Sequence, residues 1–180
     1  MSLREIVTLP EPILRRKAKP ITKFDKALQT LIDDMIDTMR DAPGVGLAAP
    51  QVNIGQQLIV VEYAEDDEEE NFDEEESETP PPVKPKLLYV MVNPEIVKAS
   101  EEKVMGVEGC LSIPGIQGEV ERHEAIQVKG LNRYGKPQKL KVDGWMARIF
   151  QHEIDHLNGV LFTDRAERVW EFQQDEEHEL

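Results

Sequence analysis

The segment His152-Glu153-Ile154-Asp155-His156 has the residue types and the spacing of a catalytic metal site. On an α-helix, residues i and i+4 share one face, so both imidazoles can bind one metal ion from the same side. Glu153 follows the first histidine and can reach a water molecule beside the ion, where it would act as an acid or base. The alternative is a solvated helix that carries two histidines at this spacing by chance. We interpret the motif as the signature of a metal-dependent hydrolase.

A third metal ligand is needed, because a catalytic metal usually has three protein ligands and one open position. One known extension of the motif places a glycine and then a third histidine downstream. Gly159 fits that extension, but its histidine position holds Phe162, which cannot bind a metal. A carboxylate from Glu167 or Glu171 remains open as the third ligand.

Cys110 is the other candidate for the third ligand. A lone cysteine is more often a small buried hydrophobic residue than a ligand. Here it follows Gly109, which lets the backbone bend or approach closely. A thiolate added to two imidazoles makes a site that can hold Fe(II), Zn(II), Co(II) or Ni(II).

A third group of residues, Gly44-Val45-Gly46-Leu47-Ala48-Ala49-Pro50-Gln51, combines small side chains with one amide. The small residues allow another chain to lie against the backbone, and Gln51 offers a side-chain donor. A turn of this composition after a helix is more often simply tightly packed. By itself this segment indicates no function.

Together, three separated segments resemble the three signatures of the peptide deformylase family. Residues 44–51 resemble GxGxAAPQ, residues 108–112 resemble EGCLS, and residues 151–156 resemble QHExDH. The opening Leu9–Arg15 is also similar to the start of that family. The resemblance covers residues 4 to 165 apart from an acidic insertion, and the joint occurrence of the three motifs in order is far more specific than any one of them.

The resemblance implies an assignment of the catalytic residues. The implied metal ligands are Cys110, His152 and His156. Glu153 would act first as a base toward water and then as an acid toward the leaving amine. The Gln51 side chain and the backbone N–H of Leu111 would stabilise the negative charge on the carbonyl oxygen. The family usually contains Fe2+, and Zn2+, Ni2+ or Co2+ are possible replacements that the ligand set does not exclude.

The implied substrate is N-formylmethionine at the start of a newly made polypeptide, from which the formyl group is removed. The peptide would lie extended and pair with the backbone of Val45, Gly46 and Gly109. Binding of this kind uses main-chain hydrogen bonds and depends little on the sequence of the peptide. Trp145 and Ile149 precede His152 on its helix and are candidates for the methionine pocket, with core packing as the alternative.

The flanking elements predict an α+β fold with short antiparallel β-sheets around a central helix that carries the HExxH motif. Apolar spacing predicts a helix over residues 24–40 that is capped by Thr22, and a second helix over residues 144–158 after Asp143. Strands are expected at 57–63 and 87–92, and a hairpin at 125–131 and 138–142. The chain should end in a short acidic helix or a tail over residues 165–180.

The charge is unevenly distributed along the chain. The net charge is −15, and eleven acidic residues lie between Glu65 and Glu78, so the remainder carries only about −4. Such a run cannot bury apolar surface, so we expect a disordered acidic insertion at 65–82 within a single catalytic domain of residues 1–180.

The composition also indicates in which compartment the protein acts and which partners it can bind. One cysteine allows no internal disulfide, and no leader or membrane-spanning segment is evident, which together favour a bacterial cytoplasmic enzyme. The acidity argues against DNA binding, and the acidic C-terminal segment should be repelled by ribosomal RNA. Stable docking on the ribosome is therefore doubtful, although transient proximity remains open. The rival functions are a different HExxH metallopeptidase and a non-catalytic relative whose metal site is structural.

Overall fold

Two antiparallel sheets and two long helices make up the fold in the computed structural model, which describes residues 2–64 and 85–173. The larger sheet has the order β1-β2-β3-β6-β7 and contains β1 (Gly46–Ala48), β2 (Leu58–Tyr63), β3 (Leu87–Ala99), β6 (Ala125–Leu131) and β7 (Pro137–Asp143). The smaller sheet has the order β4-β5-β8 and contains β4 (Lys103–Cys110), β5 (Ile113–His123) and β8 (Arg168–Glu171). The predicted α+β class is confirmed.

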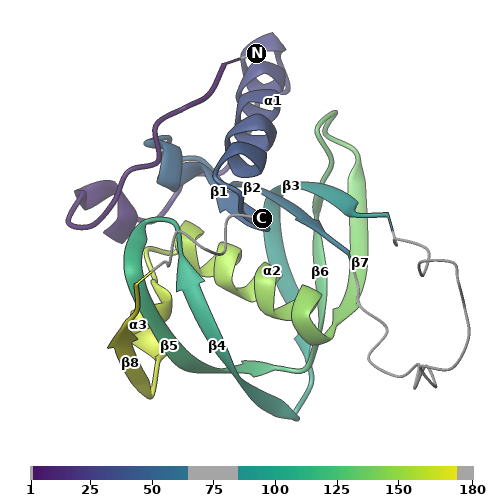
Figure 1. Cartoon of the computed structure of the whole chain (residues 1–180). Coiled ribbons are helices and arrows are strands. Elements are labelled where there is room, and N and C mark those ends of the chain that lie inside the picture. The colour runs from purple at the N-terminus through teal and green to yellow at the C-terminus, as the bar shows by residue number, and fades with distance from the viewer. Residues whose placement is uncertain (1, 65–84, 174–180) are drawn as a thin grey trace, which may run out of the picture.

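The helices lie in layers with the sheets. They are α1 (Lys26–Asp41), α2 (Gly144–Leu157) and the short α3 (Phe162–Arg165), with 3-10 turns η1 (Pro12–Arg15) and η2 (Ala49–Val52). Figure 1 shows α2 between the two sheets, with α1 on the far side of the larger one. No helix in the described residues is long and apolar enough to cross a membrane.

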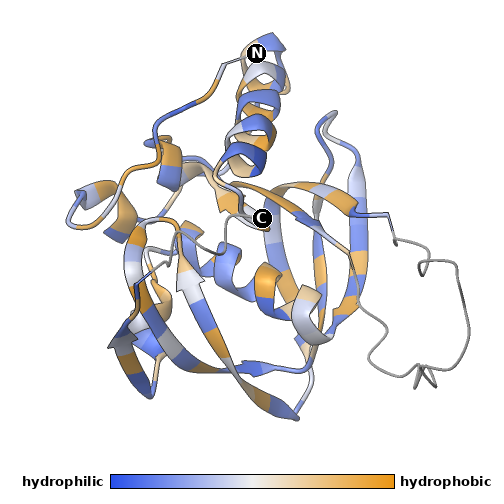
Figure 2. Ribbon diagram, in the orientation of Figure 1, coloured by the Kyte–Doolittle hydropathy of each residue, from blue (hydrophilic) through white to orange (hydrophobic). Residues whose placement is uncertain are grey.

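Alternation along β2 explains this layering. Leu58 and Val60 pack with the apolar face of α1, whereas Ile59 and Val61 point to the opposite side and pack with α2. A strand with apolar residues on both faces must be covered on both faces, which requires one helix on each side. Figure 2 shows apolar and polar residues mixed along both helices, as expected for helices that bury one side.

Helix α1 begins slightly later than its predicted start, and Thr22 is not its cap. Asp25 precedes the helix, and its side chain accepts a hydrogen bond from the Leu28 backbone N–H at 3.0 Å. An aspartate in extended backbone conformation satisfies one of the unpaired N–H groups of the first turn. Both Thr22 and Asp25 are suitable cap residues by type, so only the geometry distinguishes them.

Helix α2 follows Asp143 as predicted, although the Asp143 side chain makes no capping hydrogen bond to it. The helix ends at Leu157, and Gly159 adopts a positive φ of 73° just beyond it, which a residue with a Cβ rarely does. The predicted hairpin is also confirmed, since β6 and β7 pair from Ala125 with Asp143 to Leu131 with Pro137.

The C-terminal prediction is wrong for residues 168–171. They form strand β8, which pairs with residues 116–119 of β5 instead of forming a helix or a tail. Four residues carry too little local signal, and the pairing partner lies about fifty positions earlier in the chain. The predicted acidic insertion at 65–82 lies outside the described residues.

The N-terminal segment is held on α1 by buried Asp34. Its carboxylate accepts hydrogen bonds from the Ser2 backbone N–H at 3.0 Å and from Arg4 Nε at 3.0 Å. The Ser2 hydrogen bond lowers the pKa of Asp34 the most, and Arg4 lowers it further against the opposing effect of burial. Further along, the Val7 backbone N–H donates to the Gln51 carbonyl at 2.8 Å, so the start of the chain is also held against η2.

We expect Asp34→Asn to lower the free energy of unfolding by about 1 kcal/mol or more at pH 7, because a charged acceptor is lost. A carboxylate with a lowered folded-state pKa contributes stability above its unfolded value of 3.8, and that contribution is lost as the pH falls through the folded-state pKa. Urea unfolding from pH 7 to pH 2.5 should therefore show a gap between the two proteins that closes only at the acidic end. Asp37→Asn on the same helix is the control, and a pH-independent gap would contradict the prediction.

Candidate metal centre

Helix α2 brings His152, Glu153 and His156 to the interior of the molecule. The rings of His152 and His156 lie edge to face with their centroids 5.1 Å apart, as expected one turn apart on a helix. Both imidazoles therefore face the same region, between α2 and the end of β4.

Cys110, the last residue of β4, completes the cluster. Its Sγ lies 3.4 Å from His156 Nε2, and one donor atom each of Cys110, His152 and His156 lie within 4.8 Å of one another. Metal–sulfur and metal–nitrogen bonds of about 2.0–2.3 Å put neighbouring donors on a tetrahedral ion roughly 3.5 Å apart. The donor types and their spacing therefore fit a divalent metal ion.

The rival third ligands lie elsewhere. Phe162 occupies the position where the extended motif would have its third histidine. Its ring stacks on the His152 ring with the centroids 6.0 Å apart, so it packs against a candidate ligand and binds no metal itself. Glu167 and Glu171 are exposed beside and within β8, outside the one donor cluster found among the described residues. The cluster is thus built from one thiol and two imidazoles.

The carboxylate of Glu153 is buried beside this cluster. The residue is 4% exposed, and its Oε2 has no hydrogen-bond partner among the described residues. A Cβ on Gly46 would lie 2.7 Å from Glu153 Oε1, so only a glycine leaves room for this side chain. Burial raises the pKa of Glu153 to about 7, because the charged form loses its hydration. A carboxyl group that titrates near neutral pH can both accept and return a proton.

The side chain of Gln51 also approaches the sulfur of Cys110. Its Oε1 accepts a hydrogen bond from the Ala48 backbone N–H at 3.0 Å, which orients the amide. Its Nε2 then points to Ser112 Oγ at 3.1 Å and to Cys110 Sγ at 3.6 Å. The amide donor that the sequence predicted is therefore directed toward Cys110, one of the candidate metal ligands. Ser112 was not predicted to take part, although it belongs to the same motif as Cys110.

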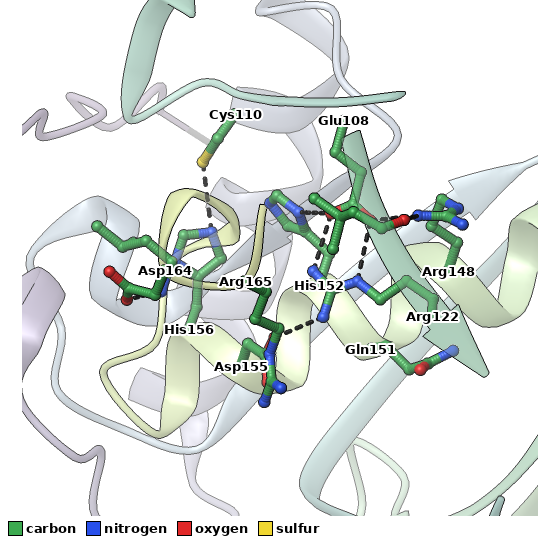
Figure 3. A network of polar contacts seen from close by, with 12 residues as sticks. Glu108, Cys110, Arg122, Arg148, Gln151, His152, Asp155, His156, Asp164 and Arg165 are labelled. Atoms are coloured by element: carbon green, nitrogen blue, oxygen red, sulfur yellow. Dashed lines mark hydrogen bonds and ion pairs between the residues drawn. The ribbon is translucent and has the colours of Figure 1, made fainter. Parts of the chain in front are cut away.

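Glu108 is the centre of a buried ionic network, shown in Figure 3. Its Oε1 accepts hydrogen bonds from His152 Nδ1 and Arg122 Nη2, both at 2.8 Å. Its Oε2 accepts from Arg122 Nε at 2.9 Å and from Arg148 Nη1 at 2.7 Å. Burial alone would raise the pKa of Glu108, but the hydrogen bonds and charges of Arg122 and His152 outweigh it and lower the pKa. Glu108 is thus a carboxylate that fixes the ring of one candidate ligand by its Nδ1 and leaves Nε2 for a metal.

The network continues to the surface through Asp155. Arg122 Nη1 donates to Asp155 Oδ2 at 2.6 Å, and Arg165 binds both oxygens of Asp155 at 2.7 and 3.0 Å. Arg122 thus forms buried ion pairs with both Glu108 and Asp155. Its two partners come from β4 and α2, so the network joins the strand and the helix that carry the candidate ligands.

Without a metal, the pKa values of the two histidines are shifted in opposite directions. Burial lowers the pKa of His156 well below its usual value, which favours the neutral ring that binds metals. Burial would also lower the pKa of His152, but hydrogen bonds with Cys110 and Glu108 outweigh it and raise the pKa.

A cavity of about 450 Å³ opens onto the cluster. Its lining includes Cys110, His152, Glu153 and Gln51, together with Leu111 in the turn between β4 and β5. The predicted substrate contacts also line it, and they are Val45, Gly46, Gly109, Trp145 and Ile149. The structure thus gathers these predicted site residues around one cavity. Glu108 and Arg148 line it too and were not predicted; the position of Glu108 within the EGCLS-like motif was the available signal for it.

Comparison with known proteins shows which family this chain resembles. A family model described as polypeptide deformylase matches residues 3–171. A peptide deformylase of Symbiobacterium thermophilum is 46% identical over 179 residues, which cover 99% of this chain and 74% of that protein. A peptide deformylase of Natranaerobius thermophilus is 42% identical over 178 residues, covering 99% of this chain and all of that protein.

A solved structure supports the same relationship at the level of the fold. The crystal structure of a peptide deformylase from Synechococcus elongatus in complex with actinonin superimposes with a TM-score of 0.76. It is 39% identical to this chain, and the match covers 92% of this chain and 79% of that one.

Proposed function

The chain belongs to the polypeptide deformylase family, and we propose that Cys110, His152 and His156 bind the catalytic metal of its reaction. The enzyme is a metal-dependent hydrolase that removes the formyl group from the N-terminus of newly made polypeptides. The observation that carries the assignment is the buried carboxylate of Glu153 at the wall of a cavity, beside a thiol and two imidazoles. Its Oε2 has no hydrogen-bond partner in the part of the chain that the structure describes.

The proposed roles follow from the positions of the side chains. A divalent metal held by the three donors supplies a Lewis acid that increases the acidity of water. Glu153 Oε2 accepts a proton from the attacking water and returns it to the nitrogen of the leaving amine. Gln51 Nε2 and the backbone N–H of Leu111 donate hydrogen bonds to the formyl oxygen as it gains negative charge. Because the Ala48 backbone N–H holds Gln51 Oε1, the donor end of the amide is already directed toward Cys110.

We propose that the substrate backbone lies between two strand edges. β1 is an outer strand of the larger sheet and β4 is an outer strand of the smaller one, and both contribute residues to the cavity. Backbone groups of Val45, Gly46 and Gly109 lie along these edges, where an extended peptide can add as a further strand. Trp145 and Ile149 form the apolar wall for the first side chain, which is methionine in the formylated substrate.

The remaining assignments concern the metal and the setting. We propose Fe2+ as the metal in the cell, with Zn2+, Ni2+ or Co2+ as replacements, since one thiolate and two imidazoles suit all four. We also propose a single catalytic domain that acts in the bacterial cytoplasm, with transient proximity to the ribosome and no stable docking through the acidic C-terminal segment.

The test is formate release from a formyl-Met tripeptide by protein purified without oxygen and loaded with Fe2+. We expect formate to appear in proportion to bound metal, and removal of the metal by a chelator should abolish it. Cleavage of an internal peptide bond without formate release would favour the metallopeptidase alternative. One bound metal per chain without any hydrolysis would favour a structural site.

Replacing Gln51 by alanine should lower kcat about a hundredfold, because one donor to the developing oxyanion is lost. KM should change little, since this donor is strongest toward the charged transition state. Steady-state kinetics on the same tripeptide check this, with Gln117→Ala on β5 as the control. A variant that keeps its kcat but has a raised KM would assign Gln51 to ground-state binding instead.

A further inference from the structure

Arg148 is a buried charged residue on the wall of the substrate cavity for which the reaction gives no direct role. It is 6% exposed, and it lies one turn before His152 on α2. Its Nη1 donates to Glu108 Oε2 at 2.7 Å and to the Val120 carbonyl at 2.8 Å, and its Nη2 donates to the Val104 carbonyl at 2.7 Å. The guanidinium is therefore fixed by β4 and β5 at the same time as it binds Glu108.

Glu108 connects Arg148 to His152, one of the candidate metal ligands. Glu108 Oε2 is shared by Arg122 and Arg148, while Oε1 is shared by Arg122 and His152 Nδ1. A carboxylate has about four lone-pair directions, so these four hydrogen bonds fill them all. These four hydrogen bonds set the orientation of the carboxylate, and the loss of the Arg148 contact leaves Oε2 held by Arg122 Nε alone.

Gly106 provides the space for this guanidinium. A Cβ built on Gly106 would lie 2.7 Å from Arg148 Cζ and 2.8 Å from its Nε and Nη2. Gly106 has no positive φ, so its lack of a side chain serves this close approach and no special backbone conformation. On another side, the guanidinium lies 5.5 Å from the centroid of the Trp145 ring, which also lines the cavity.

We propose that Arg148 is a positioning residue of the metal centre, which holds Glu108 so that Glu108 holds His152, with Gly106 as the residue that admits its guanidinium. The inference rests on the proposed metal ligands. It extends the site from β4 and α2 to a residue that touches neither the metal nor the reacting atoms. Residues that orient a metal-bound histidine typically contribute about 10–100-fold to metal affinity, so the effect is measurable.

The experiment measures the affinity of the full-length chain for Co2+ by chelator competition and records the visible spectrum of the bound ion. The variants are Arg148→Leu, Arg148→Lys, Gly106→Ala and the double variant Gly106→Ala/Arg148→Leu. We expect Arg148→Leu and Gly106→Ala each to weaken Co2+ binding about tenfold and to shift the visible bands, because His152 changes orientation. Arg148→Lys should lose less, since an ammonium can still reach Glu108. The double variant should lose no more than Arg148→Leu, because both changes break the same contact.

The controls are Gly55→Ala, where a Cβ meets nothing within 4 Å, and Arg168→Leu, which removes an exposed ion pair with Glu119 and no contact to Glu108 or Arg148. Both should bind Co2+ like the wild type. Unchanged Co2+ affinity and spectra in Arg148→Leu and Gly106→Ala would overturn the proposal, even if the metal-free proteins melt at lower temperature. If Arg148→Leu does not fold, Gly106→Ala and Arg148→Lys decide by the same criterion. A wild type that binds Co2+ but releases no formate would instead overturn the proposed function, and the affinities would still test Arg148.

Discussion

Glu153→Gln will lower the rate of formate release by about a thousandfold while the protein keeps its metal. Glutamine has nearly the volume of glutamate, so the packing beside Gly46 is preserved. It cannot accept a proton from water at neutral pH, and it cannot return one to the amine. Glu153 is 4% exposed, and its Oε2 has no hydrogen-bond partner among the described residues, so this oxygen is free to take up the proton.

The measurement combines single-turnover kinetics with metal analysis of the same sample. Metal content should stay near that of the wild type, because the donor cluster does not include Glu153. Glu121→Gln, an exposed change on β5, is the matched control and should keep full activity. If Glu153→Gln retained more than a tenth of the wild-type rate with metal bound, Glu153 would not be the proton-transfer group.

Arg122→Met will lower the free energy of unfolding of the metal-free protein by about 3–5 kcal/mol, the usual cost of removing one partner from a buried ion pair. Arg122 is 4% exposed and binds Glu108 with two nitrogens and Asp155 with a third. Methionine fills much of the volume but donates no hydrogen bond, so Glu108 loses two of its four hydrogen bonds and Asp155 loses one. Arg148 and Arg165 remain as partners, which keeps the expected cost within this range.

Urea unfolding at pH 7 after removal of the metal measures this change without a contribution from metal binding. The control is Arg168→Met, because Arg168 is an exposed residue whose ion pair with Glu119 should contribute less than about 1 kcal/mol. A loss for Arg122→Met as small as that of the control would mean that the network adds little net stability. The ionic network would then serve orientation alone.

Local sequence determined the helix that carries the HExxH motif. A period of 3.6 residues places His152 and His156 on one face whatever the rest of the chain does, so two candidate ligands could be assigned before the fold was known. The same kind of local signal predicted the hairpin of β6 and β7, where two strand-like segments flank a turn. It also predicted α1 apart from its cap, since Thr22 and Asp25 are equally suitable in type.

The third candidate ligand needed more than local pattern. Gly109 allows a close approach of the backbone at Cys110 but does not by itself make the cysteine a ligand, and a carboxylate from Glu167 or Glu171 also remained possible. The family resemblance singled out Cys110. The structure then supplies the reason, because the turn between β4 and β5 brings Sγ within 3.4 Å of His156 Nε2.

The tertiary structure alone decided how the candidate ligands are held. Glu108 and His152 are separated by 44 residues, and Arg148 reaches its carbonyl partners only because β4 and β5 pack across α2. Strand β8 likewise exists because β5 offers it a pairing edge, and no periodicity within four residues could show this. Helix period and turn chemistry act between near neighbours in the chain, so sequence predicts them. Ion pairs, strand edges and the space above a glycine arise between distant segments, and only the packed chain determines them.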